Sequence, residues 1–177
     1  MPTGDITRLQ SVTSSNGNTE TLDYDTEGRL KLTNIVFTNR SDFPALTEYT
    51  YDSLNRLTDT RYPIQYGVTG SPRKMVHNDY DVASRASSLK VDGADYASQI
   101  VYNAANQPTS LKVGNGSNQT TDTNEYDPVT SLLTRQRVQI GTSTLLDLNY
   151  GYLRQGTTSG RTGHLTSIVN NLNANRS

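Results

Sequence analysis

The chain has 177 residues, of which only 32% are hydrophobic, and its formal net charge is −1. This balance gives no electrostatic basis for binding nucleic acid or an anionic membrane surface. No apolar run reaches the length of a membrane span. The absence of cysteine excludes a disulfide framework and thiolate metal sites. So small an apolar fraction favours a sheet with one lightly apolar face and one wet face over a two-layer core.

One short motif recurs along the chain. It is clearest over Tyr24–Leu30 and again over Tyr51–Leu57. Weaker copies begin at Tyr80, Tyr102 and Tyr126, and a distorted copy begins near Tyr150. Successive copies are 22 to 29 residues apart. Self-similarity at such a period is typical of a repeat architecture.

Each copy has the chemistry of a chain reversal between two strands. Polarity alternates before the motif, over residues 21–24, and after it, over residues 30–36, which predicts strands on both sides. Asp25 can accept hydrogen bonds from the backbone of the turn, and Gly28 tolerates a positive φ. Asn55 and Asn106 stand where Gly28 stands, and the third copy has Ser84 there. Each unit is therefore predicted to be a β-hairpin.

The fold class predicted from these units is all-β, with consecutive antiparallel hairpins forming a long, twisted or spiralling sheet. Six hairpins are expected, over residues 20–37, 46–62, 74–91, 97–113, 124–140 and 145–169. Polar connections are expected over residues 39–44, 63–73, 115–123 and 155–161. Residues 4–12 and 170–177 are interpreted as partial repeats, so that residues 1–177 form a single array from a longer protein. Its open sheet edges would allow self-association.

A Tyr-Asp pair followed by Gly or Asn, then Arg and Leu, resembles the RHS or YD-repeat family of bacterial RHS proteins, toxin-complex cocoon subunits and teneurins. The residues that carry the resemblance are Tyr24, Asp25, Gly28, Arg29, Tyr51, Asp52, Asn55, Arg56, Tyr80, Asp81, Tyr102, Asn106, Tyr126 and Asp127. The resemblance implies a spiralling β-shell around a polypeptide cargo such as a C-terminal toxin domain. The family's terminal core has no counterpart here, because Asp127-Pro128-Val129 lacks the glycine of that signature. Wall material is therefore implied rather than a complete container, in a secreted or cell-surface bacterial protein.

The repeated carboxylates are interpreted as turn caps, and the tyrosines as packing between neighbouring hairpins. The recurring Arg29, Arg56 and Arg85 are expected to pair with neighbouring aspartates and fix the register. We predict no catalytic residue, and therefore no enzyme, together with no cofactor and no metal site.

Three features of the sequence could suggest a site, and none of them supports one. Residues 23–28 imitate the opening of a calcium loop, but Asn34 stands where the closing glutamate would be. His77 and His164 lie in different hairpins, without a nucleophile elbow or a phosphate loop. Four glycosylation sequons, beginning at Asn39, Asn115, Asn118 and Asn175, are interpreted as polar loops.

A second function remains open. Flat aromatic rings beside Asn, Asp and Arg can stack on sugars, and a regular sheet would present them as a ladder. Tyr51 and Tyr102 are the possible glycan contacts of an adhesin-like surface module. The expected partners are therefore the neighbouring repeats, an enclosed polypeptide, or glycans.

Overall fold

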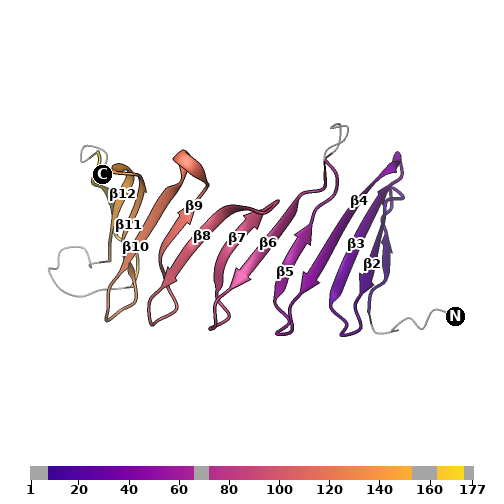
Figure 1. Cartoon of the computed structure of the whole chain (residues 1–177), viewed down its shortest axis with the longest axis horizontal. Helices are drawn as coiled ribbons and strands as arrows, with labels where there is room; N and C mark the ends of the chain where they lie inside the picture. Colours follow the sequence, from indigo (N-terminus) through magenta and orange to yellow (C-terminus); the bar gives the residue numbers. More distant parts are fainter. Residues whose placement is uncertain (1–7, 66–71, 153–162, 174–177) are drawn as a thin grey trace. The chain divides into compact units, whose positions relative to one another are not determined.

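A computed structural model describes residues 8–65, 72–152 and 163–173. In this part of the chain, thirteen strands form one open sheet in which consecutive strands are hydrogen-bonded neighbours (Figure 1). Every strand pairing whose register is resolved is antiparallel, as in the pairing of Tyr24 with Leu30 across the first hairpin. The predicted all-β fold of consecutive hairpins is confirmed. No helix among the described residues is long and apolar enough to cross a membrane.

The chain divides into two compact units, one of residues 1–79 and 90–93 and one of residues 80–89 and 94–177. The strands of the first unit are β1 (Ser11–Thr13), β2 (Thr19–Tyr24), β3 (Leu30–Phe37), β4 (Arg40–Tyr51), β5 (Leu57–Arg61) and β6 (Met75–Tyr80), whose last residue belongs to the second unit. The second unit begins with Tyr80 and holds most of β7 (Ala86–Val91), followed by β8 (Ala94–Tyr102), β9 (Pro108–Val113), the short 3-10 helix η1 (Gly116–Asn118), β10 (Thr120–Tyr126), β11 (Leu133–Ile140), β12 (Ser143–Gly151) and β13 (Ser167–Asn170).

In each unit, the repeated motifs form the chain reversals at one end of the strands. In the first unit these are the β2–β3 and β4–β5 turns, and in the second the β6–β7, β8–β9 and β10–β11 turns (Figure 1). A register shift lies immediately before Tyr24, Tyr51, Tyr102 and Tyr126. A bulge at this point inserts one extra residue and re-aims the side chains beside it. Each tyrosine therefore leaves the regular pleat where its strand ends.

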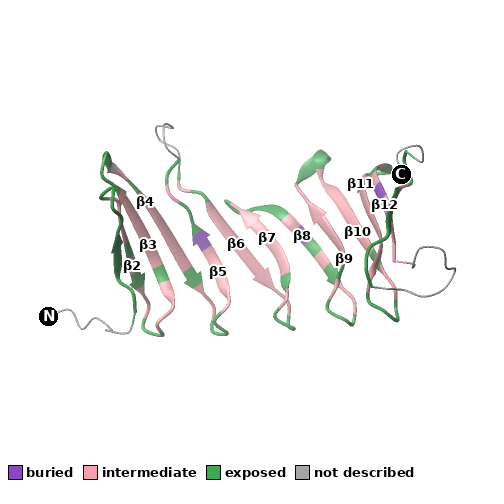
Figure 2. Cartoon of the chain, turned by 180° about the vertical axis from the view of Figure 1, so that it is seen from behind, coloured by how far each residue is buried: buried purple, intermediate pink, exposed green. Residues whose placement is uncertain are grey.

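The described part of the sheet has no buried hydrophobic core. Among the described residues no hydrophobic side chain is buried, and the buried residues are Thr60, Ser98 and Asp147 (Figure 2). Most strand residues are half-buried, because only their neighbours along and across the strands cover them. Stability must therefore come from backbone pairing and from cross-strand side-chain contacts.

The two faces differ in polarity within each unit. In the first unit, direct pairing aligns Glu48 with Arg61 and Asp59 with His77 on one face. The opposite face carries Ile35 beside Ala45, and Thr60 beside Val76. In the second unit, Arg137 and Asp147 share one face, while Val138 and Leu146 share the other. One face of each unit is thus charged and the other is more apolar.

Two predicted connections are shorter than expected. Residues 39–44 were expected to form a loop, but β4 begins at Arg40 and pairs with Phe37 across a two-residue turn. Pro44 fits within β4 because the ladder shifts register between Ile35 and Phe37, where a proline need not donate an N–H. The loop expected over residues 115–123 ends early, since β10 begins at Thr120. The loop expected over residues 155–161 lies outside the described residues.

Arg73 anchors the end of the long connection between β5 and β6. Its Nη1 donates to Glu48 Oε2 at 2.7 Å, and its Nε donates to the carbonyl of Tyr62 at 2.9 Å. Its Nη2 donates to the carbonyls of Leu46 and Arg61 at 2.8 and 3.0 Å. One planar guanidinium thus ties the connection to β4 and β5 through four acceptors.

We expect Arg73→Lys to lower the free energy of unfolding by about 1–3 kcal/mol, because an ammonium group cannot reproduce this planar fork. Urea unfolding monitored by circular dichroism measures the change. Arg61→Lys is the matched control, since its guanidinium lies 3.9 Å from Glu48 and is largely exposed. The control should change stability by less than about 0.5 kcal/mol. Equal losses in the two variants would contradict the anchoring role.

Candidate functional site

The carboxylate of Asp25 organises the first complete turn. Its Oδ1 accepts the backbone N–H groups of Glu27 and Arg29 at 3.0 and 2.8 Å. Its Oδ2 accepts Nε of Arg29 at 2.7 Å. The N–H of Gly28 donates to the Asp25 carbonyl at 3.0 Å, with Gly28 at a φ of 82°. A Cβ at this position would meet only the guanidinium of Arg8, a flexible group that can move, so it is the positive φ that favours glycine.

The same bonds recur in the second and third turns. The carboxylate of Asp52 accepts the backbone N–H groups of Leu54 and Arg56 at 2.8 and 2.9 Å. It also accepts Nε of Arg56 at 2.7 Å. Asp81 binds Arg85 in the same way, through its backbone N–H at 2.9 Å and its Nε at 2.8 Å. Asn55 and Ser84 occupy the glycine position, each with a φ of 63°.

These hydrogen bonds lower the pKa values of the turn carboxyls. For Asp52 and Asp81 the main cause is the backbone N–H of the arginine four residues on, which stabilises the carboxylate. For Asp25, burial by itself raises the pKa, but the backbone and side-chain hydrogen bonds from Arg29 outweigh it. The three carboxyls are therefore held ionised as acceptors for the turn, which leaves them poorly suited to proton transfer.

The fourth turn keeps this geometry without charge. Asn103 Oδ1 accepts the N–H groups of Ala105 and Gln107 at 2.9 and 3.0 Å, and Asn106 takes the positive φ of 60°. Asn103 Nδ2 then donates to Gln107 Oε1 at 3.0 Å, so the direction of the side-chain bond is reversed. An Asn–Gln pair replaces the Asp–Arg pair of the first three turns.

The fifth turn is one residue longer than the others. Asp127 Oδ1 accepts the N–H groups of Val129 and Thr130 at 3.1 and 2.8 Å. The residue with positive φ is Ser131, at 59°, and its N–H donates to the Asp127 carbonyl at 2.8 Å. The sequence motif places Thr130 at the glycine position, so the motif alone does not reveal this extra residue.

Four repeat tyrosines bond back to the preceding hairpin. The hydroxyl of Tyr51 donates to the carbonyl of Leu30 at 2.8 Å. The same bond joins Tyr24 to Leu9 and Tyr102 to Ala86 at 2.8 Å, and Tyr126 to Pro108 at 3.0 Å. The distorted copy differs, because Tyr150 bonds the side chain of Gln136 instead. Burial raises the pKa values of Tyr51 and Tyr126, which keeps both hydroxyls protonated as donors.

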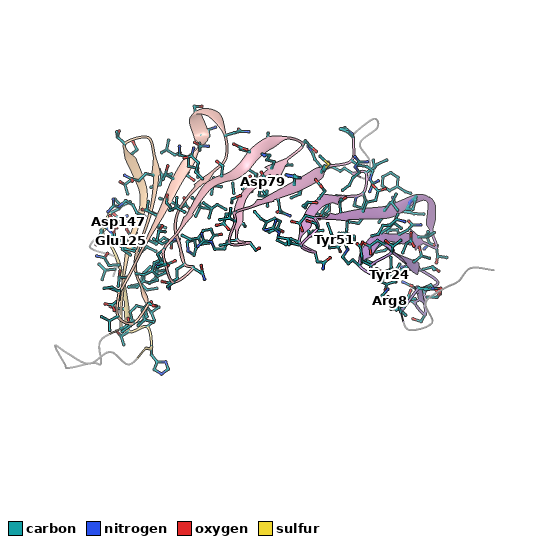
Figure 3. The ribbon with its side chains drawn as sticks, turned by 60° about the horizontal axis from the view of Figure 1, so that its bottom comes forward. Arg8, Tyr24, Tyr51, Asp79, Glu125 and Asp147 are labelled. Atoms are coloured by element: carbon teal, nitrogen blue, oxygen red, sulfur yellow. The ribbon has the colours of Figure 1, made fainter. Side chains whose placement is uncertain are left out.

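The arginines reach forward to the next hairpin. The guanidinium of Arg29 lies 4.8 Å from the ring centre of Tyr51, and its Nη1 donates to Asn55 Oδ1 at 2.7 Å. Arg85 makes the same two contacts in the second unit, with Tyr102 at 4.5 Å and with Asn106 at 3.0 Å. Arg8 lies over Tyr24 in the same way (Figure 3). Each cation–π contact of this kind is worth about 0.5–1 kcal/mol at exposed sites.

The arginines form the expected ion pairs with neighbouring aspartates, and each pair lies within a single turn. Arg29, Arg56 and Arg85 form their ion pairs with the aspartate of their own turn, four residues earlier. Contact with the next turn instead runs through a tyrosine ring and an asparagine oxygen, as Arg29 shows with Tyr51 and Asn55. The reason is the shape of the guanidinium, which presents Nε to one acceptor and Nη1 to another.

Shallow concavities lie between successive turns. In the first unit, a concavity of about 500 Å³ is lined by Glu27, Arg29, Tyr51, Asp52, Ser53 and Asn55. In the second unit, one of about 270 Å³ lies between the fourth and fifth turns and includes Tyr126 and Pro128 in its lining. Each of these two concavities between turns is therefore bordered by an aromatic ring and polar groups.

The two histidines lie apart from the turns. His77 contacts Asp79, as alternation along the strand suggests, and also Asp59 from the adjacent strand, which sequence reasoning missed. Asp81, two residues after Asp79, organises its own turn. His164 is exposed. Among the described residues, no group of three or more His, Cys, Asp or Glu side chains is arranged to hold a metal ion.

This fold and the contacts between its turns define a single-layer sheet of coupled β-hairpin repeats. A mutant Tc holotoxin pore of Photorhabdus luminescens matches it with a TM-score of 0.54 and 16% sequence identity, over 93% of this chain. A crystal structure of TcdB2–TccC3 matches with a TM-score of 0.46 and 15% identity, over 94% of this chain. The chain spans only 11% of the length of either matched chain. No family model and no curated protein sequence matches it.

The match to the holotoxin pore shows the fold of the chain. It supports, at the level of fold, the resemblance to RHS/YD-repeat proteins that the turns indicate.

A double-mutant cycle on the fourth turn tests whether the Asp–Arg and Asn–Gln pairs are equivalent. We expect Asn103→Asp combined with Gln107→Arg to be at least as stable as the native protein. Each single change, which mixes the two kinds of pair, should lower the stability. The double variant should be more stable than the sum of the two single effects predicts, by a coupling of about 0.5–1.5 kcal/mol. Urea unfolding of the four proteins measures the coupling. A coupling indistinguishable from zero would show that the side-chain pair does not contribute to the turn.

Proposed function

We propose that the chain is a wall segment of an RHS/YD-type β-shell that encloses or presents a polypeptide cargo, such as a C-terminal toxin domain. The role is structural rather than catalytic, in a secreted or cell-surface bacterial protein. The observation that carries the proposal is the coupling of consecutive turns, in which a tyrosine hydroxyl bonds backward and an arginine reaches forward, as at Tyr51 and Arg29.

Coupling of this kind suits a wall. Because the sheet has no buried hydrophobic core among its described residues, each hairpin depends on its immediate neighbours. The stability of such an array is approximately the sum of repeat and interface contributions, so the array can be extended without redesign. A binding globule would instead need a closed core around its site.

The charged face suits contact with a guest that is not tightly bound. In the second unit, Arg135 binds Asp147 through Nε and Nη2 at 2.8 and 2.6 Å, and Asn171 donates to the same carboxylate at 2.9 Å. The guanidinium of Arg135, helped by Asn171 and Arg137, lowers the pKa of Asp147 to about 2. Charges on this face are therefore neutralised within the sheet, which weakens any net attraction for a charged guest.

The proposal is tested on the complete polypeptide in which this chain occurs. We expect electron cryo-microscopy to show the hairpins as one layer around additional density, and the downstream domain to resist trypsin while the shell is intact. The same domain expressed alone serves as the control and should be cleaved. Cleavage at equal rates in both contexts, or a sheet packed against a second sheet across a dry core, would contradict the proposal.

A second candidate, glycan binding by an adhesin-like surface, is favoured by the concavity at Tyr51. The ring lies among Glu27, Asp52 and Asn55, and polar groups around an aromatic ring are suited to a sugar. The guanidinium of Arg29 lies over the ring of Tyr51, and the Tyr51 hydroxyl donates to the carbonyl of Leu30. These contacts restrict a glycan to the exposed part of the ring.

A glycan array separates the two candidates. If the second is correct, Tyr51→Ala and Tyr102→Ala should each lower glycan binding at least tenfold. Tyr62→Ala is the control, because Tyr62 is exposed and lies outside the repeat turns. Binding that is absent in the native protein, or unchanged in the Tyr51 and Tyr102 variants, would eliminate glycan recognition by these tyrosines and leave the wall proposal untouched.

A further inference from the structure

A line of alternating charges crosses three strands of the first unit. His77 of β6 places Nδ1 at 2.6 Å from Asp59 Oδ1 of β5, and Nε2 at 3.2 Å from Asp79 Oδ1 of its own strand. Lys90 of β7 lies 2.7 Å from Asp79 Oδ2. Both ring nitrogens therefore face carboxylate oxygens. A neutral imidazole has only one N–H, so only the protonated ring can donate to both acceptors.

Two cations, Arg61 and Lys90, lie on the strands beside His77. Arg61, on the same face of β5, lies toward Glu48 at 3.9 Å, and Lys90 is directed at Asp79. Asp79 is thus shared between His77 and Lys90, whereas the shorter contact runs to Asp59. The pKa of His77 is raised, chiefly by its hydrogen bond to Asp59 and secondarily by Asp79, against an opposing effect of burial.

The seam between β5 and β6 is short. Its register contains three residue pairs, which are Asp59 with His77, Thr60 with Val76, and Arg61 with Met75. The β2–β3 hairpin has six. A side-chain bond across so short a seam contributes a larger share of the strand-to-strand interaction than it would in a longer hairpin.

We propose that Asp59, His77 and Asp79 form a proton-operated clamp that holds β5 against β6 more tightly in mildly acidic than in alkaline solution. When the ring loses its proton, its ion pair with Asp59 across the seam is lost, and one of its two nitrogens presents a lone pair to a carboxylate, so that one hydrogen bond becomes a repulsive contact. The clamp stands on this geometry and does not depend on the proposed wall function.

The direction of the pH dependence follows from the raised pKa. The stabilisation is fully present below the pKa of an unfolded histidine, about 6.5, and is lost as the pH rises through the higher pKa of the folded protein. The clamp therefore loosens as the pH rises above about 6.5, while the turn carboxylates stay ionised.

NMR titration of the His77 ring in the full chain is the direct test. The midpoint should lie above about 6.5, the value of an unperturbed histidine. Asp59→Asn should lower the His77 midpoint more than Asp79→Asn does, because the contact to Asp59 is shorter and Asp79 is shared with Lys90. A midpoint at or below that of an unperturbed histidine, or a larger effect of Asp79→Asn, would overturn the clamp.

Unfolding measurements supply the second readout. Between pH 6 and pH 9 the urea midpoint of the native protein should fall more than that of His77→Gln, whose amide does not titrate. Hydrogen exchange of the β5 and β6 amides, corrected for intrinsic rates, should accelerate in the native protein over the same interval. His164→Gln should behave like the native protein. If His77→Gln and the native protein share one pH dependence, the clamp is refuted.

Discussion

Each of the five described YD-type reversals depends on one side-chain oxygen, Oδ1 of the residue that follows the repeat tyrosine. A reversing backbone presents N–H groups that have no strand partner, and an unsatisfied N–H is costly. Asp25 accepts two of them, and Asn103 does the same without a charge. What the turns share is therefore an acceptor in a fixed position. The ion pair to the arginine is an addition that the fourth turn replaces with a neutral bond.

The described residues need no buried hydrophobic core because of how these turns are joined. Tyr51 and Arg29 join adjacent hairpins through contacts between neighbouring turns. The faces of the sheet therefore need not be covered for the hairpins to stay in register. Polar and apolar faces can then serve other purposes. A single sheet of half-buried side chains would be marginal as an ordinary globule. It becomes stable by adding neighbours that repeat the same contacts.

Ionisable groups in the first unit respond in two separate pH ranges. The carboxyls of Asp25 and Asp52 have lowered pKa values, so their support for the turns is fully present above the pKa of an unfolded aspartate, about 4, and is lost as the pH falls through the lower pKa of the folded protein. The contribution of His77 changes on the opposite side, above about 6.5. The turns and the β5–β6 seam therefore depend on different protonation events, and the interval between them is where both are fully formed.

The sequence by itself determined the hairpins, because strand alternation and turn chemistry are local properties. Positive φ at Gly28 and Asn55 follows from residue type alone, and so does the all-β class. The sequence also placed Ser84 in the same position despite its lower tolerance for that conformation.

Only the tertiary structure decided which groups meet across strands. The contact of His77 with Asp59, the reach of Arg29 to Asn55 and the extra residue before Ser131 depend on register and bulges, which one repeat cannot specify. The physical reason is that a shift of one residue in a ladder moves a side chain to the other face.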